Sequence, residues 1–159
     1  MTNENLEYFK KYYYRVIKRK FHKLQDIRID FVFGKTDNGI CGRCIQIRDI
    51  FLIKVYVDNI LPNPKYIART VIHELIHARQ MRRGDLTYYG TDTVIWKGIQ
   101  YKEYLDFNSE YFVRLDTLEE FDYINAPWEI EAVEESERIL GDVIPLLYKN
   151  NKYNNYSQK

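Results

Sequence analysis

The feature that most constrains this chain is the run His73-Glu74-Leu75-Ile76-His77, which lies inside an apolar-periodic stretch from Tyr66 to Met81. Positions i and i+4 of an α-helix share one face and lie about 6 Å apart along the axis. Both imidazoles can therefore reach one metal ion while Glu74 flanks it. The sequence has only three histidines, and finding two of them at this spacing predicts a metal site on a helix.

The segment around these histidines also has the start and stop signals of a helix. Asn63 can cap its first turn, and Pro64 supplies a first residue whose missing N–H costs nothing at that position. Gly84 follows the last periodic residues and can adopt the left-handed conformation that ends many helices. We therefore expect a helix over residues 64–83.

A catalytic zinc ion takes three protein ligands and one water, so the two histidines need a further ligand. No histidine follows His77, which leaves His22, the two cysteines or a carboxylate. The best source of a carboxylate is the acidic segment after Pro127, where proline and acids in the first turn predict the start of a second helix. Residue chemistry alone predicts a third ligand among the carboxylates of residues 129–135.

Three motifs in residues 50–140 resemble those of the small gluzincin-like metallopeptidases of phage and bacterial genomes, which are distantly similar to SprT-like proteins. The motifs are His73-Glu74-x-x-His77, Trp96-x-Gly98-x-x-Tyr101 and Pro127-Trp128-Glu129-Ile130-Glu131-Ala132. In gluzincins the third ligand is a glutamate on a separate helix, frequently followed three residues later by alanine. The resemblance implies Glu129 as the third ligand, because Ala132 stands at that place, and Glu131 is the second choice.

The resemblance implies a zinc metalloendopeptidase with one catalytic Zn2+ and a peptide or protein substrate. Glu74 would act as the general base, taking a proton from water and passing it to the leaving amine. A tyrosine hydroxyl could stabilise the oxyanion. Tyr101 is preferred for its spacing after Trp96, and the alternatives are Tyr123, Tyr88 and Tyr89. An extended substrate could add to a strand edge at residues 43–48.

Two departures from the family pattern leave other interpretations open. Val133 stands where many gluzincins have an aspartate that orients a zinc-bound histidine, so the partners of the histidines are unassigned. SprT-like proteases use a third histidine, which disfavours a DNA-associated SprT-like protease here, although the basic residues 10–28 keep nucleic-acid binding open. A catalytically inert zincin-fold binding module is the other alternative, but structural zinc has no use for the intact Glu74.

Charge is distributed unevenly along the chain. Residues 102–145 contain thirteen Asp and Glu against three Lys and Arg, whereas residues 1–101 are basic. Because the net charge is only +1, this split favours internal complementarity over a nucleic-acid surface. The chain has neither a leader-like start nor a run of roughly 18 apolar residues. We expect a monomeric, cytoplasmic protein of a bacterial or phage-infected cell, without membrane contact.

The remaining patterns predict an α+β, minimal zincin-like fold with one domain over residues 1–149 and a small twisted sheet of three to four strands. The expected elements are a helix over 3–24, a hairpin of strands 27–33 and 41–48, a strand 51–57, a loop 85–93, an extended segment or hairpin 93–104, a capped helical turn 116–120, a helix from Pro127 to about Leu140 that Gly141 or Pro145 ends or kinks, and a disordered tail 150–159. His22 is interpreted as a surface histidine. Cys41 and Cys44 are interpreted as strand or turn residues with free thiols.

Overall fold

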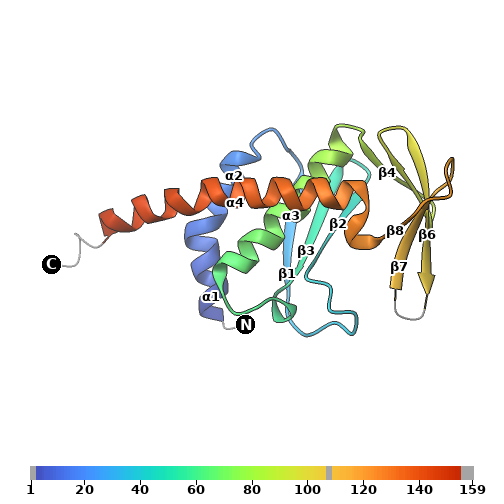
Figure 1. The fold of residues 1–159 in the computed structure, drawn as a ribbon. Coiled ribbons are helices and arrows are strands. Elements are labelled where there is room, and N and C mark those ends of the chain that lie inside the picture. Colours follow the sequence, from blue (N-terminus) through green and yellow to red (C-terminus); the bar gives the residue numbers. More distant parts are fainter. Residues whose placement is uncertain (1–2, 107–108, 155–159) are drawn as a thin grey trace.

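A computed structural model describes residues 3–106 and 109–154 (Figure 1). Helices and strands are mixed along the chain, which confirms the α+β class. The strands form two sheets, one of three strands and one of five, so the prediction of a single small sheet of three to four strands is wrong.

The N-terminal segment is a helical rod made of α1 (Asn3–Tyr8), a π-helical turn η1 (Phe9–Tyr13) and α2 (Tyr14–Lys20). Its apolar side, including Leu6, Phe9 and Ile17, is buried in the main core. The basic side chains between them stay exposed. This confirms the amphipathic helix, which ends four residues before the predicted Leu24.

The three-stranded sheet consists of β1 (Ile27–Val32), β2 (Gly42–Ile47) and β3 (Ile50–Tyr56), in the order β1-β3-β2. β1 pairs with β3 in parallel, and β2 pairs with β3 in antiparallel register. The predicted hairpin over residues 27–48 is therefore wrong. β3 is the central strand, in agreement with the burial of its side chains Phe51, Ile53 and Val55.

The central helix α3 (Pro64–Arg82) begins and ends close to the predicted residues. The Asn63 side chain accepts a hydrogen bond from the Lys65 amide at 2.9 Å, and Gly84 has a φ of +78°. α3 follows the short 3-10 turn η2 (Val57–Asn59). Its buried residues, among them Ile67 and Val71, pack into the main core against the first sheet. The helix that carries the two histidines is thus anchored on its apolar side.

The second sheet is an antiparallel meander of β4 (Leu86–Tyr89), β5 (Thr93–Trp96), β6 (Ile99–Asp106), β7 (Ser109–Arg114) and β8 (Glu120–Asp122). The hairpin at Lys97-Gly98 is confirmed, and both residues have positive φ values, as a tight two-residue turn requires. Strand β4 occupies four of the nine residues expected as a loop at 85–93. The predicted helical turn at 116–120 is wrong, since this segment joins β7 to β8 so that Phe121 pairs with Phe112.

The last helix, α4 (Pro127–Asn154), follows the 3-10 turn η3 (Tyr123–Asn125) and starts where the sequence predicts. The predicted end near Leu140 is wrong, because α4 continues through Gly141 and Pro145. Leu140 and Val143 are buried in the main core, and this burial outweighs the unfavourable helix propensities. Residues 150–154 are helical rather than tail, and residues 155–159 lie outside the described residues.

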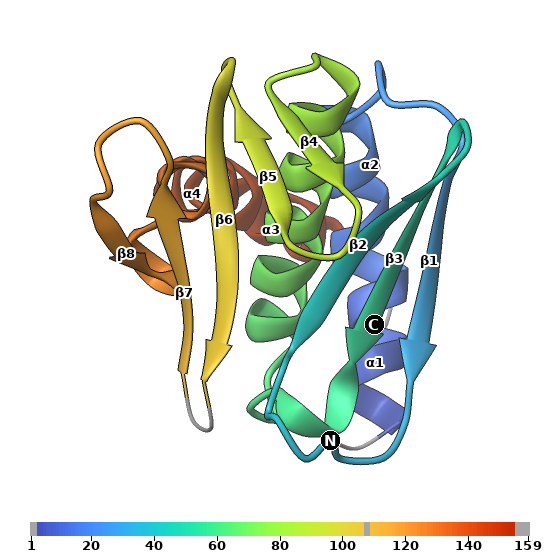
Figure 2. The same ribbon diagram turned by 90° about the vertical axis from the view of Figure 1, so that its right-hand side faces the viewer.

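Two buried clusters connect these elements to α4, the main one along its later turns and the second at its first turn. The second cluster surrounds the fully buried Trp128, which lies 4.8 Å from the Phe112 ring and 5.2 Å from the Tyr101 ring. Figure 2 shows β2 and the five-stranded sheet flanking the front of α3, with α4 behind it. The arrangement fixes the start of α4 against the middle of α3.

Ion pairs between helices bear out the expected charge complementarity. Arg69 of α3 pairs with Glu137 of α4 at 2.9 Å, and Arg79 pairs with Glu135 at 3.1 Å. Lys20 of the N-terminal rod lies 3.6 Å from Asp142. Within the described residues, no helix has both the length and the apolar character needed to cross a membrane.

Candidate metal centre

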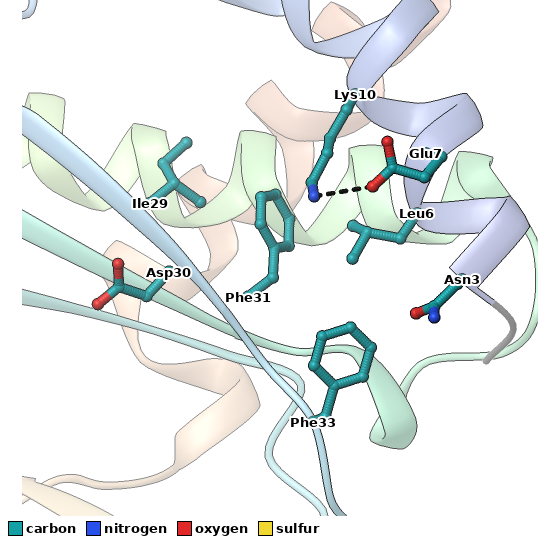
Figure 3. A pocket seen from close by; sticks show the side chains of 8 residues that line it. All are labelled: Asn3, Leu6, Glu7, Lys10, Ile29, Asp30, Phe31 and Phe33. Atoms are coloured by element: carbon teal, nitrogen blue, oxygen red, sulfur yellow. Dashed lines mark hydrogen bonds and ion pairs between the residues drawn. The ribbon is translucent and has the colours of Figure 1, made fainter.

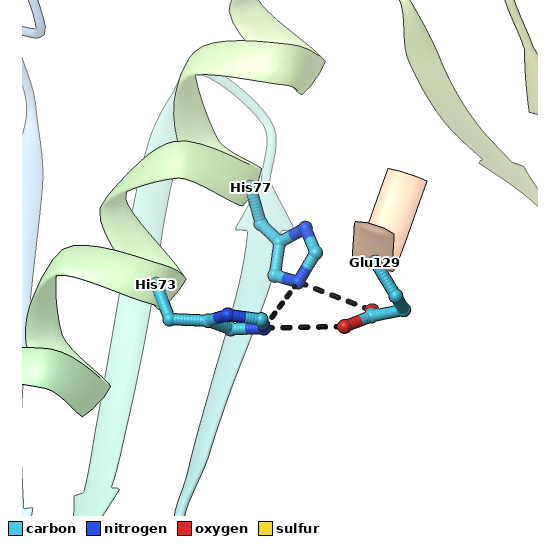
Figure 4. Close-up of side chains that lie close together, drawn as sticks. All are labelled: His73, His77 and Glu129. Atoms are coloured by element: carbon cyan, nitrogen blue, oxygen red, sulfur yellow. Dashed lines mark hydrogen bonds and ion pairs between the residues drawn. The ribbon is translucent and has the colours of Figure 1, made fainter. Parts of the chain in front are cut away.

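Three side chains from two helices converge on one point (Figure 4). The Nε2 atoms of His73 and His77, one turn apart on α3, are separated by 3.0 Å. Glu129, in the first turn of α4, places Oε2 at 3.2 Å from His73 Nε2 and Oε1 at 3.1 Å from His77 Nε2. The structure therefore brings together the predicted ligands His73 and His77 and the first-choice glutamate.

The spacing of these atoms suits a metal ion. Ligand atoms about 2.0–2.1 Å from a zinc ion at tetrahedral angles lie about 3.3 Å from one another. The two imidazole nitrogens lie 3.0 Å apart, and each lies 3.1 to 3.2 Å from one of the two Glu129 oxygens, which is close to that value. Two imidazoles and one carboxylate also form a donor set found at catalytic zinc sites. The group could hold a metal ion, with one position left for a small molecule.

Burial and charge hold the three side chains in place. Glu129 is 4% exposed and His77 is 6% exposed, whereas the side chain of His73 is 20% exposed. Burial alone would raise the pKa of Glu129, but hydrogen bonds from His73 and His77 outweigh it and lower the pKa to about 2. Burial opposes the charged form of His77, yet the hydrogen bond and charge of Glu129 raise its pKa to about 9. The two imidazoles therefore keep the Glu129 carboxyl in its ionised form.

Glu74 lies beside the ligands in a confined position. It is buried, and this burial raises the pKa of its carboxyl, while the neighbouring His77 and His73 act in the opposite direction. Strand β2 passes directly over it at Gly42, where an added Cβ would lie 2.9 Å from Glu74 Oε1. The predicted general base thus sits between the metal ligands and the edge of the first sheet.

The structure does not bring Tyr101 to this centre. Tyr101 is 2% exposed and packs within the Trp128 cluster, and the charges that act on its hydroxyl, after burial, are those of Arg114, Asp116 and Glu119. The spacing after Trp96 reflects packing in the second sheet, in which Trp96 and Tyr101 belong to one buried cluster. The oxyanion role expected for Tyr101 therefore has no support in its position.

Two of the alternative tyrosines do lie near the ligands. Burial followed by the charge of Glu129 raises the pKa of both Tyr88 and Tyr123, and hydrogen bonding with Glu129 adds to the shift at Tyr123. Tyr89 follows Tyr88 on β4, so its side chain points to the other face of the sheet. Tyr123, in the turn before α4, and Tyr88, on β4, are thus the two candidate tyrosines on whose hydroxyls the charge of Glu129 acts.

Glu131, the second-choice ligand, has a different role. One of its carboxylate oxygens accepts a hydrogen bond from Lys97 Nζ at 3.2 Å, and the other accepts one from Gln80 Nε2 at 3.3 Å. It does not belong to the converging group. Gln80 contacts His77, and the sequence did not predict this contact. The one sequence feature that indicates it is the position of Gln80 three residues after His77, on the same helix face.

The remaining candidates from the sequence lie outside the centre. His22 is exposed, with Nδ1 at 3.1 Å from the Arg19 carbonyl, which confirms a surface histidine. Cys44 lies in β2 and Cys41 directly precedes it, and both have free thiols, as expected. Burial, followed by the charge of Glu74, raises the pKa of both thiols. Neither thiol belongs to the converging group.

A separate hollow of about 560 Å3 lies between α1 and β1 (Figure 3). Its lining consists of Asn3, Leu6, Glu7, Lys10, Ile29, Asp30, Phe31 and Phe33. Lys10 and Glu7 already pair with each other there at 3.0 Å. Across the described ranges, the grouping of potential metal ligands falls at His73, His77 and Glu129, not in this hollow.

No protein-family model, curated protein or solved structure matches this chain. The interpretation of the metal centre therefore rests on its residues and their geometry.

Proposed function

We propose that this protein is a gluzincin-like zinc metalloendopeptidase in which His73, His77 and Glu129 hold one Zn2+. The observation that carries the proposal is the convergence of these three side chains at tetrahedral ligand spacing, with Glu74 buried beside them. Two histidines and a glutamate are the protein ligands of several zinc peptidases, whereas closed structural sites use four protein ligands. Three protein ligands leave a position open for water.

A zinc ion held this way supplies Lewis-acid chemistry, acidifying a water molecule and polarising a carbonyl group. Glu74 takes the proton of the attacking water and delivers it to the nitrogen of the leaving amine. Burial supports this role, because it raises the pKa of the Glu74 carboxyl and so favours uptake of a proton. Tyr123 and Tyr88 are the available donors for the oxyanion.

The proposed substrate is an extended peptide or an unfolded protein segment. β2 is an edge strand of the first sheet, paired with β3 on one side only, and it runs over Glu74. A peptide main chain that added to this edge would pass in front of the metal ligands. This position supports residues 43–48 as the substrate-binding edge.

The decisive experiment compares wild type with Glu74→Gln. We expect both proteins to bind one zinc ion per chain, and we expect hydrolysis of an unfolded fluorogenic protein substrate to fall by about 10^2–10^4-fold in the variant. Metal analysis and initial rates measure the two properties separately. Glu134→Gln, an exposed change on α4, is the matched control and should keep full activity. Unchanged activity of zinc-loaded Glu74→Gln would remove the proposed mechanism.

Two other functions give different results in the same samples. An inert zincin-fold binding module would bind zinc and hydrolyse nothing in the wild type. A DNA-associated protease would bind DNA through the exposed basic residues of the N-terminal rod, with an affinity that falls steeply as salt increases. Absence of DNA binding at low salt would exclude that alternative.

A further inference from the structure

Gln80 is a buried polar side chain between the two ligand helices. It lies on α3, three residues after His77, and is 2% exposed. Its amide oxygen is 2.8 Å from His77 Nδ1. Its amide nitrogen lies 3.0 Å from the backbone oxygen of Trp128 and 3.3 Å from Glu131 Oε1. One side chain thus contacts a ligand of α3 and the backbone next to the ligand of α4.

The partners of Gln80 determine which way its amide faces. The Trp128 carbonyl and the Glu131 carboxylate can only accept hydrogen bonds, so the amide NH2 group must point towards them. The amide oxygen then faces His77, and an amide oxygen can only accept. His77 must therefore donate from Nδ1, so Nε2, which points at His73 and Glu129, is the ring nitrogen that would ligate a metal ion.

We propose that Gln80 is the positioning residue of the metal centre: it holds His77 in the Nδ1–H form and ties the first turn of α4 to it. The inference rests on the proposed metal centre. Such an outer contact fixes the ring orientation of a metal-binding histidine, and the apolar Val133, which is 50% exposed, offers no side-chain acceptor for it. A neutral amide orients the imidazole without adding a second negative charge beside Glu129.

The network continues from Gln80 to the second sheet. Glu131 accepts from Gln80 with one oxygen and from Lys97 with the other, and Lys97 stands at the β5–β6 turn. Glu131 therefore supports the amide orientation of Gln80 from the side opposite His77. This arrangement gives the second acidic residue of the Glu-Ile-Glu segment a function other than ligation.

The first test uses the wild-type protein and needs no substitution. With only three histidines in the chain, the ring nitrogens can be assigned by 15N NMR on zinc-loaded protein. We expect His77 to carry its proton on Nδ1 and to show a slowly exchanging Nδ1–H signal, because this N–H is buried and bonded to Gln80. A His77 proton on Nε2, or a rapidly exchanging Nδ1–H, would overturn the inference.

The second test measures zinc affinity by competition with a chelator. Gln80→Leu removes the acceptor while keeping the side-chain size, and we expect affinity to fall by about 10–100-fold and the slow His77 signal to disappear. Gln80→Glu restores an acceptor and should retain the Nδ1–H signal. Gln100→Leu, the same change at an exposed position of β6, should change neither property.

These outcomes are independent of peptide hydrolysis. Zinc affinity within twofold of wild type in Gln80→Leu, with the His77 signal unchanged, would overturn the positioning role and leave the proposed peptidase standing. Conversely, a wild type that binds zinc and shows the His77 signal but cleaves no peptide would contradict the proposed function alone.

Discussion

Gly42 and Glu74 are in such close contact that the strand and the helix carrying them allow no side chain between them. A Cβ atom at Gly42 would lie 2.9 Å from both Cγ and Oε1 of Glu74, and 2.8 Å from Cγ2 of Thr70. The glycine of the Cys-Gly-Arg-Cys sequence is therefore explained by the approach of β2 to α3. It sets the distance between the strand edge and the proposed general base.

Gly42→Ala should disturb Glu74 without removing a metal ligand. We expect zinc stoichiometry to stay at one per chain while the hydrolysis rate falls at least about tenfold, because the added methyl group displaces the carboxylate or the strand. Gly141→Ala is the matched control: it lies in α4 with no atom near its added Cβ, and should increase stability by about 0.5–1 kcal/mol. Unchanged kinetics in Gly42→Ala would show that the two elements can separate at no cost to the reaction.

Glu129→Gln and Glu131→Gln distinguish the ligand from its neighbour. A neutral amide at position 129 removes the one anionic ligand, so zinc should no longer copurify at one ion per chain. At position 131 the change leaves all three ligands in place, and stoichiometry should remain at one. Metal analysis after dialysis measures both. Loss of zinc in Glu131→Gln together with retention in Glu129→Gln would reverse the assignment.

Tyr123→Phe tests a candidate oxyanion donor, and Tyr101→Phe tests the tyrosine that the sequence favoured but the structure places elsewhere. Tyr123 interacts with Glu129, so loss of its hydroxyl should lower kcat by about 10^2-fold if it is the donor. Tyr101 keeps its ring packed on Trp128 in the phenylalanine variant, and its kcat should stay near that of wild type. Steady-state kinetics on the same substrate, with circular dichroism to confirm folding, make the comparison. A selective loss in Tyr101→Phe would contradict the placement of the two hydroxyls.

The pairing of Glu110 with Glu103 predicts a pH dependence of stability. Burial, then the hydrogen bond and charge of Glu103, raise the pKa of Glu110 from 4.5 to about 7. Because the folded-state pKa exceeds the unfolded one, the protonated group contributes stability that is fully present below pH 4.5 and lost as pH rises through 7.

Glu110→Gln should therefore gain stability relative to wild type as pH rises from 5 to 8. The amide stays neutral throughout this interval, whereas Glu110 loses its proton beside Glu103. Thermal unfolding at several pH values measures the difference in Tm between the two proteins. Glu134→Gln is the exposed control, and its Tm difference should not vary with pH. A constant difference for Glu110→Gln would contradict the raised pKa.

Local signals in the sequence predict α3, the helix that carries the two histidines. Asn63, Pro64 and Gly84 act on the backbone within a few residues, and the histidine spacing needs nothing beyond helix geometry. The start of α4 is predicted for the same reason. These elements contain all three residues of the converging group.

Strand pairing and the end of α4 could not be predicted in this way, because they depend on distant residues. Alternation along 27–33 indicates a strand but not its partner, and the chain places β3 between β1 and β2. Pro145 is a reliable local stop signal, yet Val143 is buried against helices far away in sequence. The amide orientation of Gln80 likewise depends on Trp128 and Glu131, which no local pattern connects to it.

The separation of the ligands along the chain has a consequence for biosynthesis. His73 and His77 lie one turn apart on α3, but Glu129 comes 56 positions after His73, and the whole five-stranded sheet lies between α3 and α4 in the sequence. A chain that grows from its N-terminus has two of the three ligands long before the third is made. Closing a loop of this length also carries an entropic cost that packing around Trp128 must offset. A nascent or truncated chain would therefore have an incomplete centre, so that the proposed peptidase activity would arise only when folding of the following sheet is finished.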